Sequence, residues 1–223
     1  MTPLSAPRLL RWLPLALVLA LALVVFGPSL GFEFVEWDDP TFLTQNPLVI
    51  DAPHQSALDE LLTPNLGYPI PFTVLTYRVE NALFGVSNAA PYHFTNVLLH
   101  LLGIGLLYAV ARRLKLSPVA SAFAAAVFGL HPAVAESVSW VTGRKDLLMT
   151  AATLGALWLI LVPQPNPAVP AKPSRAVLAS SALLCVIALL SKPTGACAAL
   201  VAGVVLAARV GGKSGRLLAL KTY

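Results

Sequence analysis

Two adjacent carboxylates, Asp38 and Asp39, follow the first long apolar run of the chain and lie beside Trp37. Trp side chains favour membrane–water interfaces, so the sequence predicts this acidic pair at a membrane surface. Because like charges repel, we expect one carboxylate to have a raised pKa or the pair to bind a divalent cation. A carboxylate in this place could accept the proton of an attacking hydroxyl. The alternative is a turn or a helix cap, since Asp-Asp-Pro-Thr is also a good capping sequence.

Three polar residues, His93, Asn96 and His100, share one face of a predicted helix that continues into an apolar run. Polar groups inside a membrane need partners, so this face is expected to point into a helix bundle or a cavity. It would line a cleft for a donor or an acceptor, or it would supply hydrogen bonds between helices. Two His residues without a third ligand do not predict a metal site.

The segment 131–146 combines an acid, an aromatic ring and a guanidinium. Glu136, Trp140 and Arg144 are spaced four residues apart, which would place them on one face of a helix. We expect His131 and Glu136 to line the same cleft as the polar stripe of the preceding helix. Residues 131–146 and the polar face of the preceding helix would then belong to one site.

The residues that must position these groups are mostly apolar. Of 223 residues, 57% are hydrophobic and only 11% are charged, whereas soluble domains carry about 25% charged residues. So much apolar surface requires lipid as a solvent, and the sequence therefore predicts an all-α, multi-pass integral membrane protein. The net charge of +5 is spread in short clusters beside apolar runs, which favours membrane topology over nucleic-acid binding.

Six apolar runs predict a bundle of membrane spans. Several of them are shorter than the roughly 20 residues of a perpendicular span, so their bounds are approximate. The predicted spans are residues 12–32, 94–111, 117–131, 147–163, 176–191 and 195–210.

Between the first two spans, residues 33–92 form a large exterior loop. A short helix is expected from Asp51 to Leu62. A second, amphipathic helix is expected from Phe72 to Phe84, behind a Pro-rich start, and it would lie flat on the membrane with its apolar stripe down. The members of that stripe are Phe72, Leu75, Val79 and Leu83.

Orientation follows from the basic residues, most of which face the cytoplasm if the N-terminus is inside. All ten carboxylates then lie in the exterior loops or at their edges, and an exterior active site would explain this segregation. Arg144 and Lys145 are basic residues on the exterior side, where the topology rule disfavours them. They could hold the phosphate of a lipid-linked donor together with the adjoining Asp146. The alternative is an ion pair of Arg144 with Glu136 or Asp146.

Several short motifs follow one another through most of the chain, and they resemble those of the transmembrane-and-tetratricopeptide-repeat glycosyltransferases. The motifs are Trp37-Asp-Asp-Pro40, Asn46-Pro47, Tyr68-Pro-x-Pro71, Leu75-Thr76, Leu83-Phe-Gly85, Tyr92-His-Phe-Thr-Asn-Val-Leu-Leu-His100, Phe128-Gly-Leu-His-Pro132, Glu136-Ser-Val-Ser-Trp140, Gly143-Arg-Lys-Asp-Leu-Leu148 and Leu190-Ser-Lys-Pro193.

That family is similar to the protein O-mannosyltransferases and has the multi-span GT-C fold. The resemblance implies an inverting transfer of a sugar, expected to be mannose, from a polyprenyl-phosphate carrier to a protein hydroxyl on the exterior side. The family's acidic pair matches Asp38 and Asp39. Its second-loop elements match His131, Pro132, Glu136, Gly143, Arg144 and Asp146.

The chain also departs from the family pattern. The family continues through further spans into tetratricopeptide repeats that these 223 residues lack, so we expect a fragment. Pro193 replaces an acid or a hydroxyl that often follows Ser-Lys in the family. The expected setting is a bacterial inner membrane with periplasmic site loops. The partners would be membrane lipid, the lipid-linked sugar as co-substrate, and a protein or glycan acceptor.

Two other functions compete with sugar transfer. A catalytically inactive membrane anchor or scaffold would fit a chain that has lost its downstream spans. A solute transporter fits less well, because the carboxylates lie in loops instead of at midspan, and no broken pair of spans with charge at the bilayer centre is seen.

Overall fold

The computed structural model describes residues 12–51, 68–162 and 173–210, and the described residues form helices and turns without a strand. The predicted all-α class is confirmed. The longer helices are α1 (Leu13–Phe26), α4 (Pro71–Phe84), α5 (Ala90–Arg113), α6 (Pro118–Leu130), α8 (Arg144–Ile160), α9 (Arg175–Ser191) and α10 (Ala196–Val210). Shorter pieces are η2 (Gly27–Gly31), η3 (Pro40–Thr44), α2 (Pro47–Ile50), η4 (Pro132–Val134), α7 (Ala135–Ser139), η5 (Val141–Gly143) and η6 (Pro193–Gly195).

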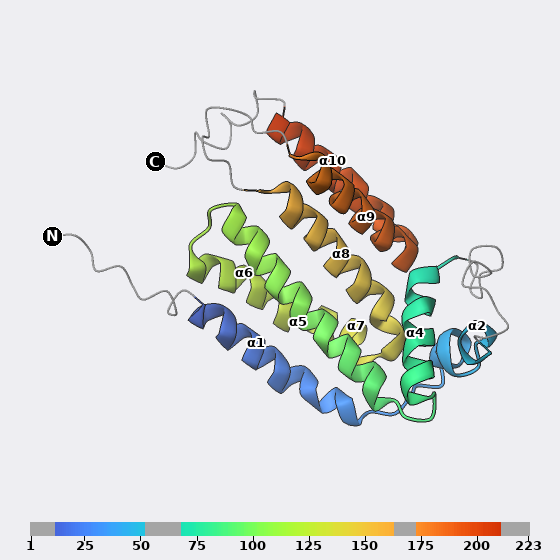
Figure 1. The fold of residues 1–223 in the computed structure, drawn as a ribbon. Coiled ribbons are helices and arrows are strands. Elements are labelled where there is room, and N and C mark those ends of the chain that lie inside the picture. The colour runs from blue at the N-terminus through green and yellow to red at the C-terminus, as the bar shows by residue number, and fades with distance from the viewer. Residues whose placement is uncertain (1–11, 52–67, 163–172, 211–223) are drawn as a thin grey trace.

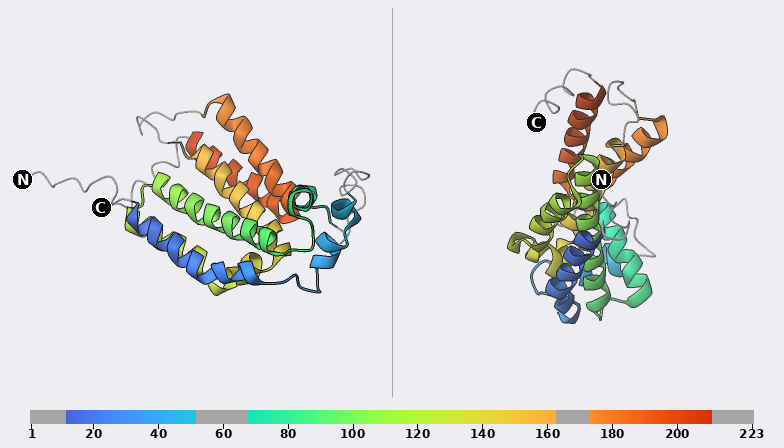
Figure 2. Two further views of the ribbon diagram at one scale, coloured as in Figure 1. Left: turned by 60° about the horizontal axis from the view of Figure 1, so that its bottom comes forward. Right: turned by 90° about the vertical axis from the view of Figure 1, so that its left-hand side faces the viewer.

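The long helices lie side by side as a bundle (Figure 1). Helix α5 is central: it packs against α1 and α6 on one side and against α8 on the other, and α8 in turn packs against α9. Figure 2 shows α2 and α4 gathered at one end of these rods. The loops that hold the sequence-predicted site residues are thus collected at one end of the bundle.

Within the described ranges, two segments are long and apolar enough to cross a membrane, Leu13–Gly31 and Ala90–Arg113. A third exists if α6 and the bent continuation Pro132–Ser139, which turns by 52°, form one span. Helices also form at the other three predicted runs, as α8, α9 and α10. Their crossing of the membrane stays a prediction, because they are short for a bilayer core of about 30 Å.

The amphipathic helix predicted in the first loop is confirmed as α4. Pro71 begins it, where the missing N–H costs nothing, and Gly85 ends it with a φ of +73°, a conformation that favours glycine. Of the predicted apolar stripe, Leu75, Val79 and Leu83 are exposed, and Leu83 is 68% exposed. The stripe is therefore free to face lipid. The helix expected from Asp51 to Leu62 lies, apart from Asp51, outside the described residues.

The prediction that one helix carries Glu136, Trp140 and Arg144 on one face is wrong. Helix α7 ends at Ser139, Trp140 is extended, and the tight turn η5 leads into α8 at Arg144. The turn folds back onto α7 so closely that a Cβ on Gly143 would lie 2.5 Å from the Ser137 carbonyl oxygen. Only a residue without a side chain permits this close approach of the backbone. The resulting turn separates the side chains of Glu136, Trp140 and Arg144.

We predict that Gly143→Ala destabilises the chain, because the new methyl group would meet backbone atoms that cannot rotate away. The expected loss is about 1–3 kcal/mol in the free energy of unfolding. Gly105→Ala is the matched control: this helical glycine has open space around its Cβ position, and removing a helical glycine gains about 0.5–1 kcal/mol. Thermal unfolding in detergent measures both. Equal stability of the two variants would contradict the close approach.

Candidate functional site

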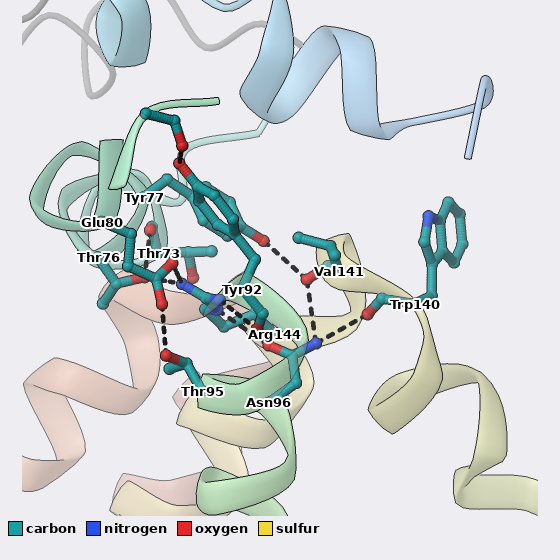
Figure 3. A network of polar contacts seen from close by, with 11 residues as sticks. Thr73, Thr76, Tyr77, Glu80, Tyr92, Thr95, Asn96, Trp140, Val141 and Arg144 are labelled. Carbon is teal, nitrogen blue, oxygen red and sulfur yellow. Dashed lines mark hydrogen bonds and ion pairs between the residues drawn. The ribbon is translucent and has the colours of Figure 1, made fainter. Parts of the chain in front are cut away.

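Among the described residues, Arg144 has the largest fully buried side chain, with 0% exposure. Its Nε donates to Asn96 Oδ1 at 3.0 Å, and its Nη2 donates to the Tyr92 carbonyl at 2.8 Å. Its Nη1 forms an ion pair with Glu80 and reaches Thr76 Oγ1 at 3.4 Å (Figure 3). The guanidinium is thus held by α4 and α5 while its own backbone begins α8.

The same hydrogen-bond network also binds the backbone at the turn η5. Asn96 Nδ2 donates to the carbonyls of Trp140 and Val141, at 2.9 and 3.2 Å. The Tyr77 hydroxyl donates to the Val141 carbonyl at 3.1 Å, and burial raises the pKa of Tyr77 well above its usual range. The Arg144 guanidinium lies over the Tyr77 ring at 4.7 Å. Asn96 therefore acts as an interhelical link, which is the alternative given for it above.

The alternative given for Arg144, an ion pair with Glu136 or Asp146, is wrong in its partner, because Arg144 pairs with Glu80. Glu80 was not predicted from the sequence, because it is 64 residues away from Arg144 and belongs to a different helix. One signal pointed to it: under the predicted orientation Arg144 is a basic residue on the disfavoured side of the membrane, and Glu80 lies on the polar face of an amphipathic helix in the adjoining loop. Such an arginine needs an acid.

Of the acidic pair, Asp39 is the buried member, with 0% exposure. Its Oδ2 accepts the Val35 N–H at 2.8 Å, whereas its Oδ1 has no hydrogen bond of good geometry. Burial raises the pKa of Asp39, and the Val35 N–H together with nearby Thr142 and Trp140 partly offsets this shift. The carboxylate makes no helix-cap hydrogen bond, so its observed role is to hold the loop that leads to Asp38.

Asp38 is only half-buried and belongs to a mixed-charge rim. We define the charged rim as Asp38, Lys145, Asp146 and Lys192. Lys192, at the end of α9, forms an ion pair with Asp146. Burial lowers the pKa of Lys145, while the nearby carboxylates of Asp146 and Asp38 raise it. Lys145 thus lies within electrostatic range of two carboxylates and a second amine, which come from three distant parts of the chain.

Aromatic rings border the charged rim. The Lys145 Nζ donates to the Thr142 carbonyl at 2.9 Å and lies 5.2 Å from the Phe42 ring and 5.7 Å from the Trp140 ring. Tyr68 is half-buried beside the rim, and burial together with the charge of Asp38 raises its pKa. Lys192 and Tyr68 are site residues that belonged to quoted motifs but that the sequence analysis did not assign to a site.

The predicted polar stripe of α5 lies inside the protein. His93 is buried with its ring 6.2 Å from that of Phe32 and within electrostatic range of Asp39, and neither ring nitrogen has a hydrogen bond of good geometry. The Nε2 atom of His100 lies 2.9 Å from the Gly129 carbonyl oxygen. His93 is therefore close to the acidic pair, and His100 links two helices.

The remaining predicted residues lie on the surface. His131 is exposed, and its Nδ1 accepts the Ala133 N–H at 3.1 Å as a cap of the turn η4. Glu136 is exposed on α7, within electrostatic range of Lys145. In the part of the chain that the structure describes, no three His, Cys, Asp or Glu side chains form a metal-ion cluster. A divalent cation at the acidic pair stays a prediction.

We predict that Arg144→Ala and Glu80→Ala each lower the free energy of unfolding by about 3–5 kcal/mol, because each leaves an unpaired buried charge. The double variant should lose clearly less than the sum of the two. Glu136→Ala is the control: it should change stability by at most about 0.5 kcal/mol and add to Arg144→Ala. Denaturant unfolding measures the three single variants and the two double variants. Additive losses for Glu80 and Arg144 would contradict their pairing.

The raised pKa of Asp39 predicts a pH dependence of stability. The folded chain binds this proton more tightly than the unfolded chain, so the contribution is complete below the ordinary Asp pKa of about 3.9 and is lost as pH rises through the folded pKa. Asp39→Asn cannot ionise. The melting temperature of Asp39→Asn, relative to that of the unsubstituted chain, should therefore increase as pH rises from about 4 to 7. The relative melting temperature of Glu136→Gln, a change at an exposed residue, should stay constant over the same range.

Comparisons with known proteins agree with the family resemblance. Over 149 residues the chain is 33% identical to the human protein O-mannosyl-transferase TMTC4, covering 58% of this chain and 20% of that protein. It is 34% identical to Tmtc1 of Drosophila melanogaster, with coverage of 57% and 16%. It is 28% identical to F38B6.6 of Caenorhabditis elegans, with coverage of 65% and 22%.

The chain spans about a fifth of the length of these curated relatives. No family model matches it, and no solved structure matches it, so the GT-C fold stays a prediction. The resemblance read from the motifs is confirmed in its coarse form. Over more than half of its length, this helical membrane chain is similar to proteins named as protein O-mannosyl-transferases.

Proposed function

We propose that this chain forms the acidic loop and the charged rim of a membrane glycosyltransferase. The reaction transfers mannose from a polyprenyl-phosphate donor to a protein hydroxyl on the exterior side. The observation that carries the proposal is the charged rim, where the half-exposed carboxylate of Asp38 shares one edge with the amines of Lys145 and Lys192. The similarity to proteins named as O-mannosyl-transferases supports the choice of reaction and sugar.

Asp38 is the proposed general base. It is the accessible member of the acidic pair, whereas the Asp39 carboxylate is buried and bonded to the loop backbone. Asp38 takes the proton of the acceptor hydroxyl as that oxygen attacks the anomeric carbon from the face opposite the phosphate. The bond from the anomeric carbon to the phosphate oxygen breaks, and the sugar inverts its configuration. Asp39 and His93 are positioning residues beneath this loop.

Lys145 and Lys192 are the proposed partners of the donor phosphate. Each offers a flexible ammonium charge, and both lie within electrostatic range of Asp146, which forms an ion pair with Lys192. An entering phosphate replaces Asp146 as the partner of Lys192 and stabilises the charge of the leaving polyprenyl phosphate. The donor-binding role expected for Arg144 shifts to positioning, because its guanidinium is already bound by Glu80, Asn96 and the Tyr92 carbonyl.

The test is mannose transfer from a polyprenyl-phosphate donor to a Ser/Thr peptide, measured in membranes that contain the chain. Asp38→Asn should lower the rate by about 10²–10⁴ with the melting temperature preserved. Lys145→Ala and Lys192→Ala should raise the KM for the donor and leave the KM for the peptide unchanged. Lys115→Ala, on the turn after α5, is the matched control and should change neither.

A wild-type rate for Asp38→Asn would overturn its role as the base. A donor KM that is insensitive to both lysine substitutions would overturn the phosphate site. If the unsubstituted chain binds the donor but transfers nothing, the proposed activity is refuted for this chain, and the anchor hypothesis takes its place.

A further inference from the structure

A pair of arginines lies at the end of the bundle opposite the acidic loop. Arg113 ends α5 and Arg209 lies in the last turn of α10, and both reach the C-terminal end of α8. Arg113 donates to the Trp158 carbonyl, and its guanidinium carbon lies 3.8 Å from the centre of the Trp158 ring. Arg209 donates to the carbonyls of Ile160 and Val162. Figure 1 shows the ends of α5, α8 and α10 at this same end of the bundle.

The two guanidinium groups lie close enough to repel one another. Within these 223 residues no Asp or Glu occurs between Glu80 and Glu136 or after Asp146, so the helices that meet at this end carry no acidic partner for the two arginines. The carbonyls at the end of α8 supply only the partial negative charge of a helix C-terminus, equivalent to about half an elementary charge. Among the residues that the structure describes, these two positive charges are therefore held together with less than one negative charge against them.

The position of the arginine pair determines which anion fits. Arg113 is the last residue of a segment long and apolar enough to span a membrane, so its guanidinium lies where a span meets the headgroups. Trp158, stacked against it, is of a type that favours the same level. Each guanidinium has five N–H donors, and the carbonyl contacts use one nitrogen of Arg113 and two of Arg209, which leaves donors for a phosphate.

We propose that Arg113 and Arg209 form a binding site for the phosphate of an anionic phospholipid headgroup. Two guanidinium groups on different helices bind one phosphodiester by charge-assisted hydrogen bonds, and the acyl chains remain in the bilayer beside α5 and α10. The bound lipid joins α5, α8 and α10 at their common end. With the predicted orientation, the lipid comes from the cytoplasmic leaflet. This inference rests on the fold alone and is independent of the sugar-transfer proposal.

The experiment reconstitutes the chain in nanodiscs of phosphatidylcholine and titrates phosphatidylglycerol into them, with the melting temperature as the readout. Phosphatidylglycerol should raise the melting temperature saturably. Arg113→Gln and Arg209→Gln should each weaken the apparent affinity about fivefold, and the double variant should abolish the rise. Arg175→Gln is the matched control, because Arg175 is an exposed arginine at the start of α9, and it should keep the full rise.

Loss of the contacts to α8 could also lower stability, but this loss acts equally in pure phosphatidylcholine, so only the lipid-dependent rise tests the site. Arg113→Lys with Arg209→Lys keeps both charges and should retain part of the rise. An unchanged rise in the double Gln variant, or an equal loss in Arg175→Gln, would overturn the proposal. Soluble glycerol phosphate that reproduced the rise in pure phosphatidylcholine would also overturn it, in favour of a site for free phosphate.

Discussion

The burial of one guanidinium constrains the whole loop end of this molecule. Arg144 has no contact with water, and a buried charge is stable only with an opposite charge and a full set of hydrogen bonds. Those partners come from α4 and α5, so the surface helix, the central span and the start of α8 must dock together before the charge is satisfied. The turn η5 then depends on the same residues, since Asn96 and Tyr77 bind its carbonyls.

The two carboxylates of the acidic pair differ in burial, and this difference gives them different roles. Adjacent carboxylates repel, and the fold resolves this by placing one against the protein and leaving the other at the edge. The buried Asp39 meets the Val35 N–H, and its loss of hydration raises its pKa. A group in that environment fixes the shape of a loop. The half-exposed Asp38 keeps its access to solvent and to the amines of the charged rim, as its proposed role as a general base requires.

Charge is segregated along the bundle axis. The described carboxylates lie towards the loops at one end, and the arginines at the other end bind helix carbonyls in place of acids. With the predicted orientation, the two ends would meet different headgroup layers, and each end would then encounter a distinct set of ligands. The proposed sugar donor and the proposed phospholipid both carry phosphate, but they would bind at opposite faces.

The sequence by itself determined the helical class, the places of the long helices and the amphipathic α4, because hydropathy and helical periodicity are local properties. It also determined which motifs resemble a known family. The partner of Arg144 could not be predicted, since Glu80 is far away in sequence and the pairing depends on how α4 docks. The spacing of residues also could not show that Gly143 permits a turn that separates Glu136 from Arg144. It equally could not show that Lys192 belongs to the charged rim. Tertiary packing decided these, because the cost of burying a charge or a backbone group depends on every element that surrounds it.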